Sequence, residues 1–270
     1  MEEQSKKLAG FNLELKRSNS DLEHFAYAAS HDLREPLRVI SSFTRLLAKN
    51  YQDTKEKETA QYIYFIQDGV TRMTKLIQNL LDYARVGKHE VKFTKTKLNN
   101  IVATKLFDLS ELIKEKNAHV EVDDLPTIYC EKEQISMLFN NLISNAIKFN
   151  KKDKRIVKIT NHQDAPNGYW KISVSDNGIG IKKEYQKKIF EIFQRLHAKS
   201  EFEGTGIGLA LCQKIIQSHK GEITVTSVMG EGTTFSLLIP KTLGKQIDLT
   251  NDATEDLVSK IISPINMEKN

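Results

Sequence analysis

The residue best suited to act as a nucleophile is His31, in the run SHDLREPLR. A neutral imidazole nitrogen is a good nucleophile near pH 7. Well downstream, and in this order, the chain carries NNLISNAIKF, DNGIG and GTGIGLAL. Any one of these segments has an ordinary structural explanation, but their order predicts a nucleophile followed by the parts of a nucleotide site.

The segment NNLISNAIKF places Asn141 and Asn145 four residues apart on a helix predicted over residues 131–149, so that their side chains share one face. Amide oxygens can ligate Mg²⁺, and amide nitrogens can donate to phosphate. Lys148 extends the same face with a positive charge. Taken alone, two helical asparagines are more often solvated or bonded to a neighbouring strand.

The segment DNGIG follows a predicted strand that ends at Asp176. A carboxylate there can accept a hydrogen bond from an exocyclic amine such as that of adenine. Gly178 and Gly180 let the backbone pass close to a flat ring. A tight turn is the plainer reading of this segment alone, because Asn-Gly is a common turn signal.

A third segment, rich in glycine, opens a helix predicted over residues 205–219. N–H groups at a helix N-terminus and the helix dipole favour phosphate. The spacing is close to the dinucleotide fingerprint, but no βαβ unit brackets it, and the Walker pattern is absent. The residues concerned are Gly204, Thr205, Gly206, Gly208 and Leu209.

Residues 180–204 predict a lid over the nucleotide, with Phe190 and Phe193 as apolar anchors. Most of its lysines read as a solvated face, and Arg195 is the predicted phosphate contact. Taken together, the segments predict transfer of the γ-phosphoryl group of ATP onto a histidine.

Two long helices must position His31. Apolar residues step by three and four over residues 8–29, and then by four as far as Leu37, a stutter that locally unwinds a supercoil. His31 lies inside the stutter. Pro36 lacks an N–H and crowds the carbonyl four residues back, which predicts a kink beside the histidine.

The second helix is predicted from an unbroken apolar series between Ile63 and Ala84, after a turn at residues 50–54. One helical hairpin leaves its apolar stripe half covered, so we predict pairing into a dimeric four-helix bundle. Packing against the rest of the chain is the alternative.

From residue 91 the pattern changes to short strands mixed with helices. Strands are predicted over residues 92–97, 119–122, 127–130, 155–160, 169–175, 222–227 and 233–239, with a further helix over 98–116. This predicts an α+β sandwich with helices on one face of a mixed sheet. The predicted domains are a coiled-coil transmitter helix (1–19), the helical hairpin (20–88), the sandwich (91–242) and a tail (243–270).

Composition excludes several other classes of protein. The chain has 270 residues, 39% of them hydrophobic and 28% charged, as expected of a globular protein. A net charge of +5, mixed along the chain, reads as a solvated surface and not as a nucleic-acid site. Cys130 and Cys212 lack metal or redox spacing, and no apolar run approaches a membrane span of about 18 residues. We therefore expect a cytoplasmic protein without a membrane segment in this chain.

The ordered segments resemble those of bacterial sensor histidine kinases of two-component systems, over residues 20–240. SHDLREPLR resembles their H box, NNLISNAIKF the N box, DNGIG and GTGIGLAL the two main glycine boxes, IFEIFQRL the F box and GEGTTF the closing glycine segment. The resemblance implies a dimerisation and phosphoacceptor domain followed by a Bergerat-type ATP-binding domain, as in DNA gyrase, mismatch-repair and heat-shock ATPases.

The resemblance also implies roles for individual residues. His31 would attack the γ-phosphorus, Asn145 with Asn141 would hold Mg²⁺, and Asp176 would bind adenine. The phosphoryl group would then pass to an aspartate of a response regulator receiver domain in trans, because this chain has no receiver domain.

A carboxylate beside the histidine should hold its other ring nitrogen. Helix spacing nominates Glu35, whereas the family pattern nominates Asp32, which we follow because a kink at Pro36 weakens the spacing argument. Many family members carry Thr or Asn where this chain has Glu35, a position linked to dephosphorylation of the regulator. We therefore expect weak phosphatase activity.

Two other functions share part of this pattern. One is a conformational ATPase of the gyrase or chaperone type, and the other is a catalytically silent dimeric scaffold. The paired helices around His31 argue against the first, and the complete nucleotide segments argue against the second. The seam at residues 8–29 further predicts a sensor module upstream of this chain.

Overall fold

The computed structural model describes residues 33, 36–47, 56–87, 93–196, 202 and 204–242. The chain divides into two compact units, Met1–Leu81 and Asp82–Asn270, which are taken here one at a time. His31, Asp32 and Glu35 lie outside the described residues, as do the predicted transmitter helix, the turn at 50–54 and the tail.

The described residues of the first unit form two helices that run in opposite directions. Residues 36–47 are helical, and α2 spans Glu56–Arg85. The Phe43 ring stacks on that of Phe65 with centroids 4.7 Å apart. At the other end of this contact, a Cβ on Gly69 would lie 3.0 Å from Ile40 Cγ1 and 3.4 Å from the Pro36 carbonyl oxygen. A glycine therefore lets the two helices approach closely beside the predicted kink, and the predicted hairpin is confirmed.

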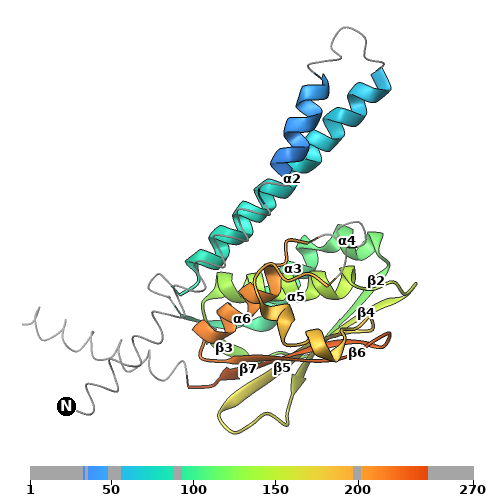
Figure 1. Cartoon of the computed structure of the whole chain (residues 1–270). Coiled ribbons are helices and arrows are strands. Elements are labelled where there is room, and N and C mark those ends of the chain that lie inside the picture. Colours follow the sequence, from blue (N-terminus) through green and yellow to red (C-terminus); the bar gives the residue numbers. More distant parts are fainter. Residues whose placement is uncertain are drawn as a thin grey trace, which may run out of the picture. The chain divides into compact units, whose positions relative to one another are not determined.

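The second unit is a sandwich of helices on a mixed sheet, as predicted (Figure 1). Its five-stranded sheet has the order β2-β4-β5-β7-β6, in which β2 is parallel to β4 and the other pairs are antiparallel. These strands are β2 (Ala118–Val122), β4 (Arg155–His162), β5 (Tyr169–Asp176), β6 (Glu222–Val228) and β7 (Gly232–Pro240). β1 (Thr94–Lys97) and β3 (Thr127–Cys130) form a separate antiparallel pair.

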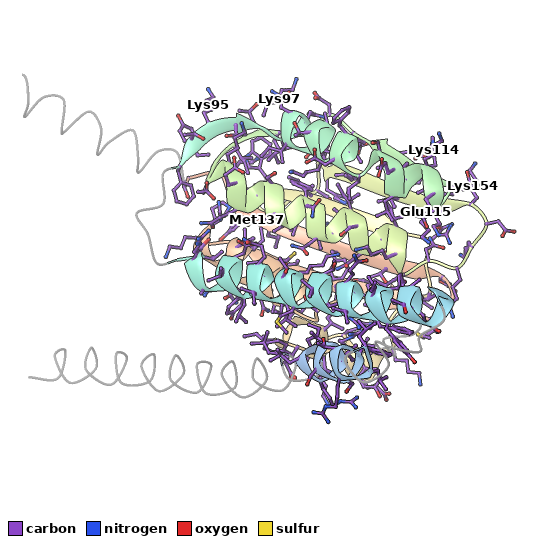
Figure 2. All side chains as sticks on the ribbon, turned by 90° about the horizontal axis from the view of Figure 1, so that it is seen from above. Lys95, Lys97, Lys114, Glu115, Met137 and Lys154 are labelled. Atoms are coloured by element: carbon purple, nitrogen blue, oxygen red, sulfur yellow. The ribbon has the colours of Figure 1, made fainter. Side chains whose placement is uncertain are left out.

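The helices of this unit cover one face of the sheet. They are α3 (Leu98–Asp108), α4 (Ser110–Glu115), α5 (Lys132–Lys148) and α6 (Gly208–Ser218). Figure 2 looks down on this layer, with Lys95 and Lys97 of β1 at one end and Lys114, Glu115 and Lys154 at the other. α5 packs against both α3 and α6 and buries residues on most of its circumference. It is the central helix of the core, as expected of a helix that is apolar on several faces.

The strands show why the sheet has a helical face. In β7, alternate residues are buried, among them Phe235, Leu237 and Ile239. Successive side chains of a strand point to opposite faces, so one face of β7 packs under the helices. Asp176 is the last residue of β5 and pairs with Thr233 near the start of β7. The predicted adenine contact therefore lies where these two central strands meet the loops at one end of the sheet.

Two helices differ from their predicted bounds. The helix expected over residues 98–116 is bent at Leu109, whose N–H and carbonyl still bond to Lys105 and Ile113, so the hydrogen-bond ladder continues through the bend. The helix expected from Thr205 begins at Gly208, because Gly206 has a φ of +73°, which lies outside the helical region.

A buried histidine joins the start of α5 to the end of α6. His219 Nε2 accepts the Glu131 N–H at 3.1 Å, and Nδ1 lies 2.8 Å from the Ile215 carbonyl oxygen, to which it donates. Burial holds the pKa of His219 below its usual value, so the ring stays neutral and keeps this tautomer. Glu131 in turn caps α5, its carboxylate accepting from the Glu133 and Gln134 N–H groups.

α2 is helical across the division between the units, and its last turn belongs to the second one. Val86, which follows that turn, is 3% exposed and lies in the second unit's core. Among the described helices, none combines the length and the apolar character that crossing a bilayer requires.

Candidate nucleotide site

Asp176, the last residue of β5, is a partly buried carboxylate, and one of its two oxygens is engaged in hydrogen bonds. Oδ1 accepts from the Gly178 N–H at 2.7 Å and from the Thr233 N–H at 3.2 Å. Oδ2 has no hydrogen-bond partner among the residues that the structure describes. Burial raises the pKa of Asp176 to about 6, and the two N–H bonds only partly oppose this rise. At neutral pH the carboxylate is therefore largely ionised, with Oδ2 available as an acceptor.

The glycines after Asp176 are required by the surrounding backbone. A Cβ on Gly178 would overlap the Phe149 carbonyl, and one on Gly180 would overlap the Val228 carbonyl. Gly180 also has a φ of +73°. Ile179 between them donates to the Phe149 carbonyl at 3.0 Å and accepts from the Gly230 N–H at 2.8 Å. The DNGIG segment is thus held between the end of α5 and the turn that joins β6 to β7.

Two asparagines fix this segment from behind, and sequence reasoning missed their role. Asn150 is buried, and its Nδ2 donates to Asn177 Oδ1 at 2.7 Å. The same Oδ1 accepts from the Ile156 N–H at 2.9 Å, while Asn177 Nδ2 donates to the Lys154 carbonyl at 3.1 Å. Asn177 lies inside DNGIG and Asn150 just after NNLISNAIKF, so their positions could have indicated a role at the site. Their hydrogen bond to each other could not be read from the sequence.

Asn141 and the glycine run meet where α5 crosses the start of α6. The Asn141 Nδ2 donates to the Met137 carbonyl at 3.0 Å, which directs Oδ1 toward Gly208. A Cβ on Gly208 would lie 2.6 Å from that oxygen. Asn145, one turn further along α5, is partly buried, and its side chain makes no hydrogen bond with the described residues. Lys148 ends the helix on the same side.

The first turn of α6 begins directly beside Asn141. The first N–H groups of a helix have no partner within it, so those at the start of α6 can bind an anion. Gly206 places its carbonyl where the Phe193 N–H donates to it at 2.9 Å, with the Phe193 backbone too close for any side chain at position 206. Leu209 packs against the core, whereas Gly204 lies in open space, and Thr205 between them is partly buried.

Arg195 bonds to the far end of its own loop. Its Nη2 donates to the Phe202 carbonyl at 3.0 Å. The Phe202 ring lies 4.9 Å from that of Phe149, and Lys151 Nζ lies 5.5 Å from the Phe202 centroid. Arg195 and Phe202 therefore lie beside Phe149, the residue that follows α5. A phosphate contact by Arg195 stays a prediction. Of the two predicted anchors, Phe190 packs on the core against Phe235.

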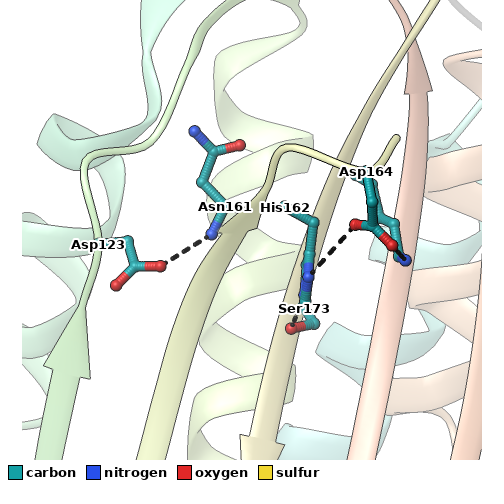
Figure 3. A network of polar contacts seen from close by, with 6 residues as sticks. Asp123, Asn161, His162, Asp164 and Ser173 are labelled. Atoms are coloured by element: carbon teal, nitrogen blue, oxygen red, sulfur yellow. Dashed lines mark hydrogen bonds and ion pairs between the residues drawn. The ribbon is translucent and has the colours of Figure 1, made fainter. Parts of the chain in front are cut away.

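A second polar cluster combines Ser173, His162 and Asp164 (Figure 3). The His162 Nε2 lies 2.7 Å from Ser173 Oγ, and Nδ1 lies 3.8 Å from Asp164 Oδ1. The residue types match a nucleophilic triad. However, Ser173 is 3% exposed between β4 and β7, and Asp164 is bound by Lys171 Nζ at 2.9 Å. A substrate cannot reach that hydroxyl, so the cluster stabilises the β4–β5 hairpin.

Comparison with known families assigns both parts of the chain. Residues 21–88 match the His Kinase A (phospho-acceptor) domain, and residues 130–243 match the histidine kinase-, DNA gyrase B- and HSP90-like ATPase family. Cyanobacterial phytochrome A of Nostoc sp. is 41% identical over 237 residues, which are 88% of this chain and 31% of that protein. The adaptive-response sensory kinase SasA of Crocosphaera subtropica is 33% identical over 78% of this chain and 57% of its own length. The chain spans about a third of the phytochromes that it matches.

Solved structures of histidine kinases resemble this chain in fold. Histidine kinase ThkA, in its crystal structure with the response regulator protein TrrA, has a TM-score of 0.66 and 25% identity, over 84% of this chain and 64% of that one. Histidine kinase AdeS of Acinetobacter baumannii has a TM-score of 0.61 over 78% of this chain and 98% of that one. At 19% identity, the second likeness concerns the fold alone.

Proposed function

Because the chain belongs to the sensor histidine kinases, we propose that it is the catalytic core of an ATP-dependent autokinase that phosphorylates His31. The observation that carries the proposal is the contact between Asn141 and Gly208. It joins the asparagine face of α5 to the start of α6, where we expect phosphate to bind, within a domain whose family is an ATPase fold.

The residues present fit ATP with Mg²⁺. The Asp176 Oδ2 would accept from the exocyclic amine of adenine, and the first N–H groups of α6 would donate to phosphate. The amide oxygens of Asn145 and Asn141 would ligate Mg²⁺, which prefers few protein ligands beside phosphate oxygens. In the described part of the chain, no group of three His, Cys, Asp or Glu side chains is placed to hold a metal. When bound, the ion would neutralise charge on the transferring phosphoryl group.

His31 would attack the γ-phosphorus as a neutral imidazole, with Asp32 holding its other nitrogen. Both residues fall in the matched phosphoacceptor domain, outside the described part of the structure. The phosphoryl group would then pass to an aspartate of a separate response regulator. ThkA, which was solved with such a protein, supports this step.

We further propose that the chain acts as a homodimer. On α2, Ile63, Val70 and Ile77 are 43%, 49% and 41% exposed and stand seven residues apart. A seven-residue repeat of apolar side chains is the pattern of a helix that packs on others. A second copy of the hairpin would bury this stripe in a four-helix bundle.

The test is incubation with γ-³²P-ATP and Mg²⁺, for the wild type and His31→Gln, followed by acid and base treatment. We expect acid-labile, base-stable label on the wild type and none on the variant, because only the imidazole is then missing. Label retained by His31→Gln would move the site elsewhere. ATP binding without label would favour the conformational ATPase or the silent scaffold.

Glu35 leads to a further prediction about the regulator. We expect slow loss of regulator phosphate when this protein is added, because a carboxylate would repel the anionic phosphoryl group where the family often has Thr or Asn. Glu35→Thr should speed the loss about tenfold, an effect within the usual range for one positioned polar group. Release of ³²P-phosphate from the labelled regulator measures it. Equal rates for the wild type and the variant would contradict the prediction.

A further inference from the structure

The last turn of α2 is held by a lysine from another helix. Lys214, on α6, donates from Nζ to the Tyr83 carbonyl oxygen at 2.7 Å. The same ammonium lies 4.1 Å from the centroid of the Tyr83 ring. One side chain thus binds both the backbone and the ring of a single residue in the final turn of α2.

The physical chemistry of a helix end explains this contact. The last carbonyls of a helix have no partner within it, and they form the negative end of its dipole. An ammonium placed there satisfies a carbonyl and opposes that partial charge. The Tyr83 ring adds a cation–π contact. Lys214 therefore acts as a C-terminal cap of α2, supplied from 131 residues further along the chain.

This contact between Lys214 and Tyr83, called the clamp below, joins two helices that have different roles in the proposed reaction. α2 is the second helix of the hairpin that carries His31, and it continues into the second unit, where Val86 is buried in the core. α6 begins at the predicted phosphate site. Within the second unit, α6 therefore has the predicted phosphate site at its first turn and the last turn of α2 against its seventh residue, Lys214.

We propose that Lys214 is a positioning residue for phosphoryl transfer: by clamping the last turn of α2 to α6, it fixes the helix leading from the phosphoacceptor hairpin against the helix that holds the phosphates. This inference rests on the autokinase function proposed above. The Lys214 ammonium is bound at Tyr83, so we expect its loss to leave the affinity for nucleotide unchanged. The loss lowers the rate of transfer, because a displacement of about 1 Å can reduce a rate a hundredfold.

The experiment compares Lys214→Met, Lys214→Arg and the control Gln217→Met in the chain of 270 residues. Methionine keeps the length of the side chain and removes the ammonium, arginine restores a cation, and Gln217 is an exposed residue of the same helix. Three quantities are measured: the Kd for ATP, the autophosphorylation rate at saturating ATP, and amide hydrogen exchange in the last turn of α2. One reporter of that exchange is the Val86 N–H, which bonds to the Asp82 carbonyl at 3.3 Å.

For Lys214→Met we expect an unchanged Kd, a transfer rate lower by about tenfold or more, and exchange at Val86 faster by severalfold. Lys214→Arg should recover most of the rate, and Gln217→Met should behave as the wild type. A Lys214→Met rate equal to that of the wild type overturns the positioning role, and unchanged exchange overturns the clamp itself. Exchange does not depend on catalysis, so a wild type without label would remove the autokinase proposal while the clamp is still judged by its own measurement.

Discussion

Asp176→Asn should strongly weaken ATP binding and at the same time make the ligand-free protein more stable. Burial raises the carboxyl pKa from an ordinary 3.8 to about 6. At neutral pH the folded protein therefore contains an ionised carboxylate that would be more stable in water. An amide is uncharged and still offers an oxygen to the Gly178 and Thr233 N–H groups. Its NH₂ would replace Oδ2 and oppose the amine of adenine, so affinity should fall about a hundredfold or more.

The sign of the pH dependence follows from the direction of the shift. Because the folded pKa lies above the unfolded one, the folded state binds more protons between pH 3.8 and about 6, and Asp176 costs stability as pH rises through that range. Asn removes this cost, which is about 1–3 kcal/mol at 1.36 kcal/mol per unit after allowance for partial exposure. The Tm gain should be full at pH 8 and absent at pH 3.5.

Calorimetry at both pH values and titration with ATP measure the two effects. Asp164→Asn is the matched control, since this carboxylate is 71% exposed and the Lys171 ammonium holds its pKa below the ordinary value. That control should keep ATP affinity and show no stabilisation at pH 8. A lower Tm for Asp176→Asn at pH 8, or undiminished affinity, would contradict the account of Asp176.

Gly180→Ala should unfold or displace the DNGIG segment, which is predicted to contact the nucleotide, whereas Gly168→Ala should not. Both glycines have a positive φ, +73° and +85°, so each alanine carries a similar backbone strain of about 1–2 kcal/mol. Only at Gly180 would the new Cβ overlap a backbone carbonyl, that of Val228; around Gly168 there is open space. Because backbone cannot rotate aside, Gly180→Ala should cost more than about 4 kcal/mol.

Thermal unfolding and ATP titration distinguish these two variants. For a domain of this size, 1 kcal/mol corresponds to a Tm shift of about 2–4 °C. Gly168→Ala should therefore melt a few degrees lower with normal ATP affinity, and Gly180→Ala should melt at least about 10 °C lower with binding lost. Equal melting temperatures would show that the close approach at Val228 does not constrain this segment.

Features that repeat along the chain were predictable from sequence. Strand alternation in β4, β5, β6 and β7 and the periodicity of α5 gave the sandwich, because one buried face dictates a regular spacing of apolar residues. Helix starts were less predictable. Thr205 precedes an apolar series like a cap, but Gly206 turns out of helical geometry and delays α6 to Gly208.

Pairings between distant residues could not be predicted. His219 has no motif around it, and its partner Glu131 stands 88 residues away. The same holds for Asn150 with Asn177 and for Lys214 with Tyr83. The type of each residue indicates that its side chain needs a hydrogen-bond partner, but only the folded chain determines which residue that partner is. For Arg195, the type suggested phosphate, and the structure adds a bond to the Phe202 carbonyl.

The bond from the Thr233 N–H to Asp176 Oδ1 also bears on how the protein matures. Gly232 packs so closely on the Asp176 carbonyl that no side chain fits between them, and β7 lies between β5 and β6 in the sheet. During synthesis, β5, α5 and α6 emerge before β7. The Gly178 N–H is therefore available to the carboxylate early, whereas the Thr233 N–H becomes available only when β7 inserts beside β5. A nascent chain that ends before β7 would lack one of the two N–H groups that hold the carboxylate proposed to bind adenine. Nucleotide binding can therefore serve as a marker of completed folding, for example in a series of ribosome-stalled chains of increasing length.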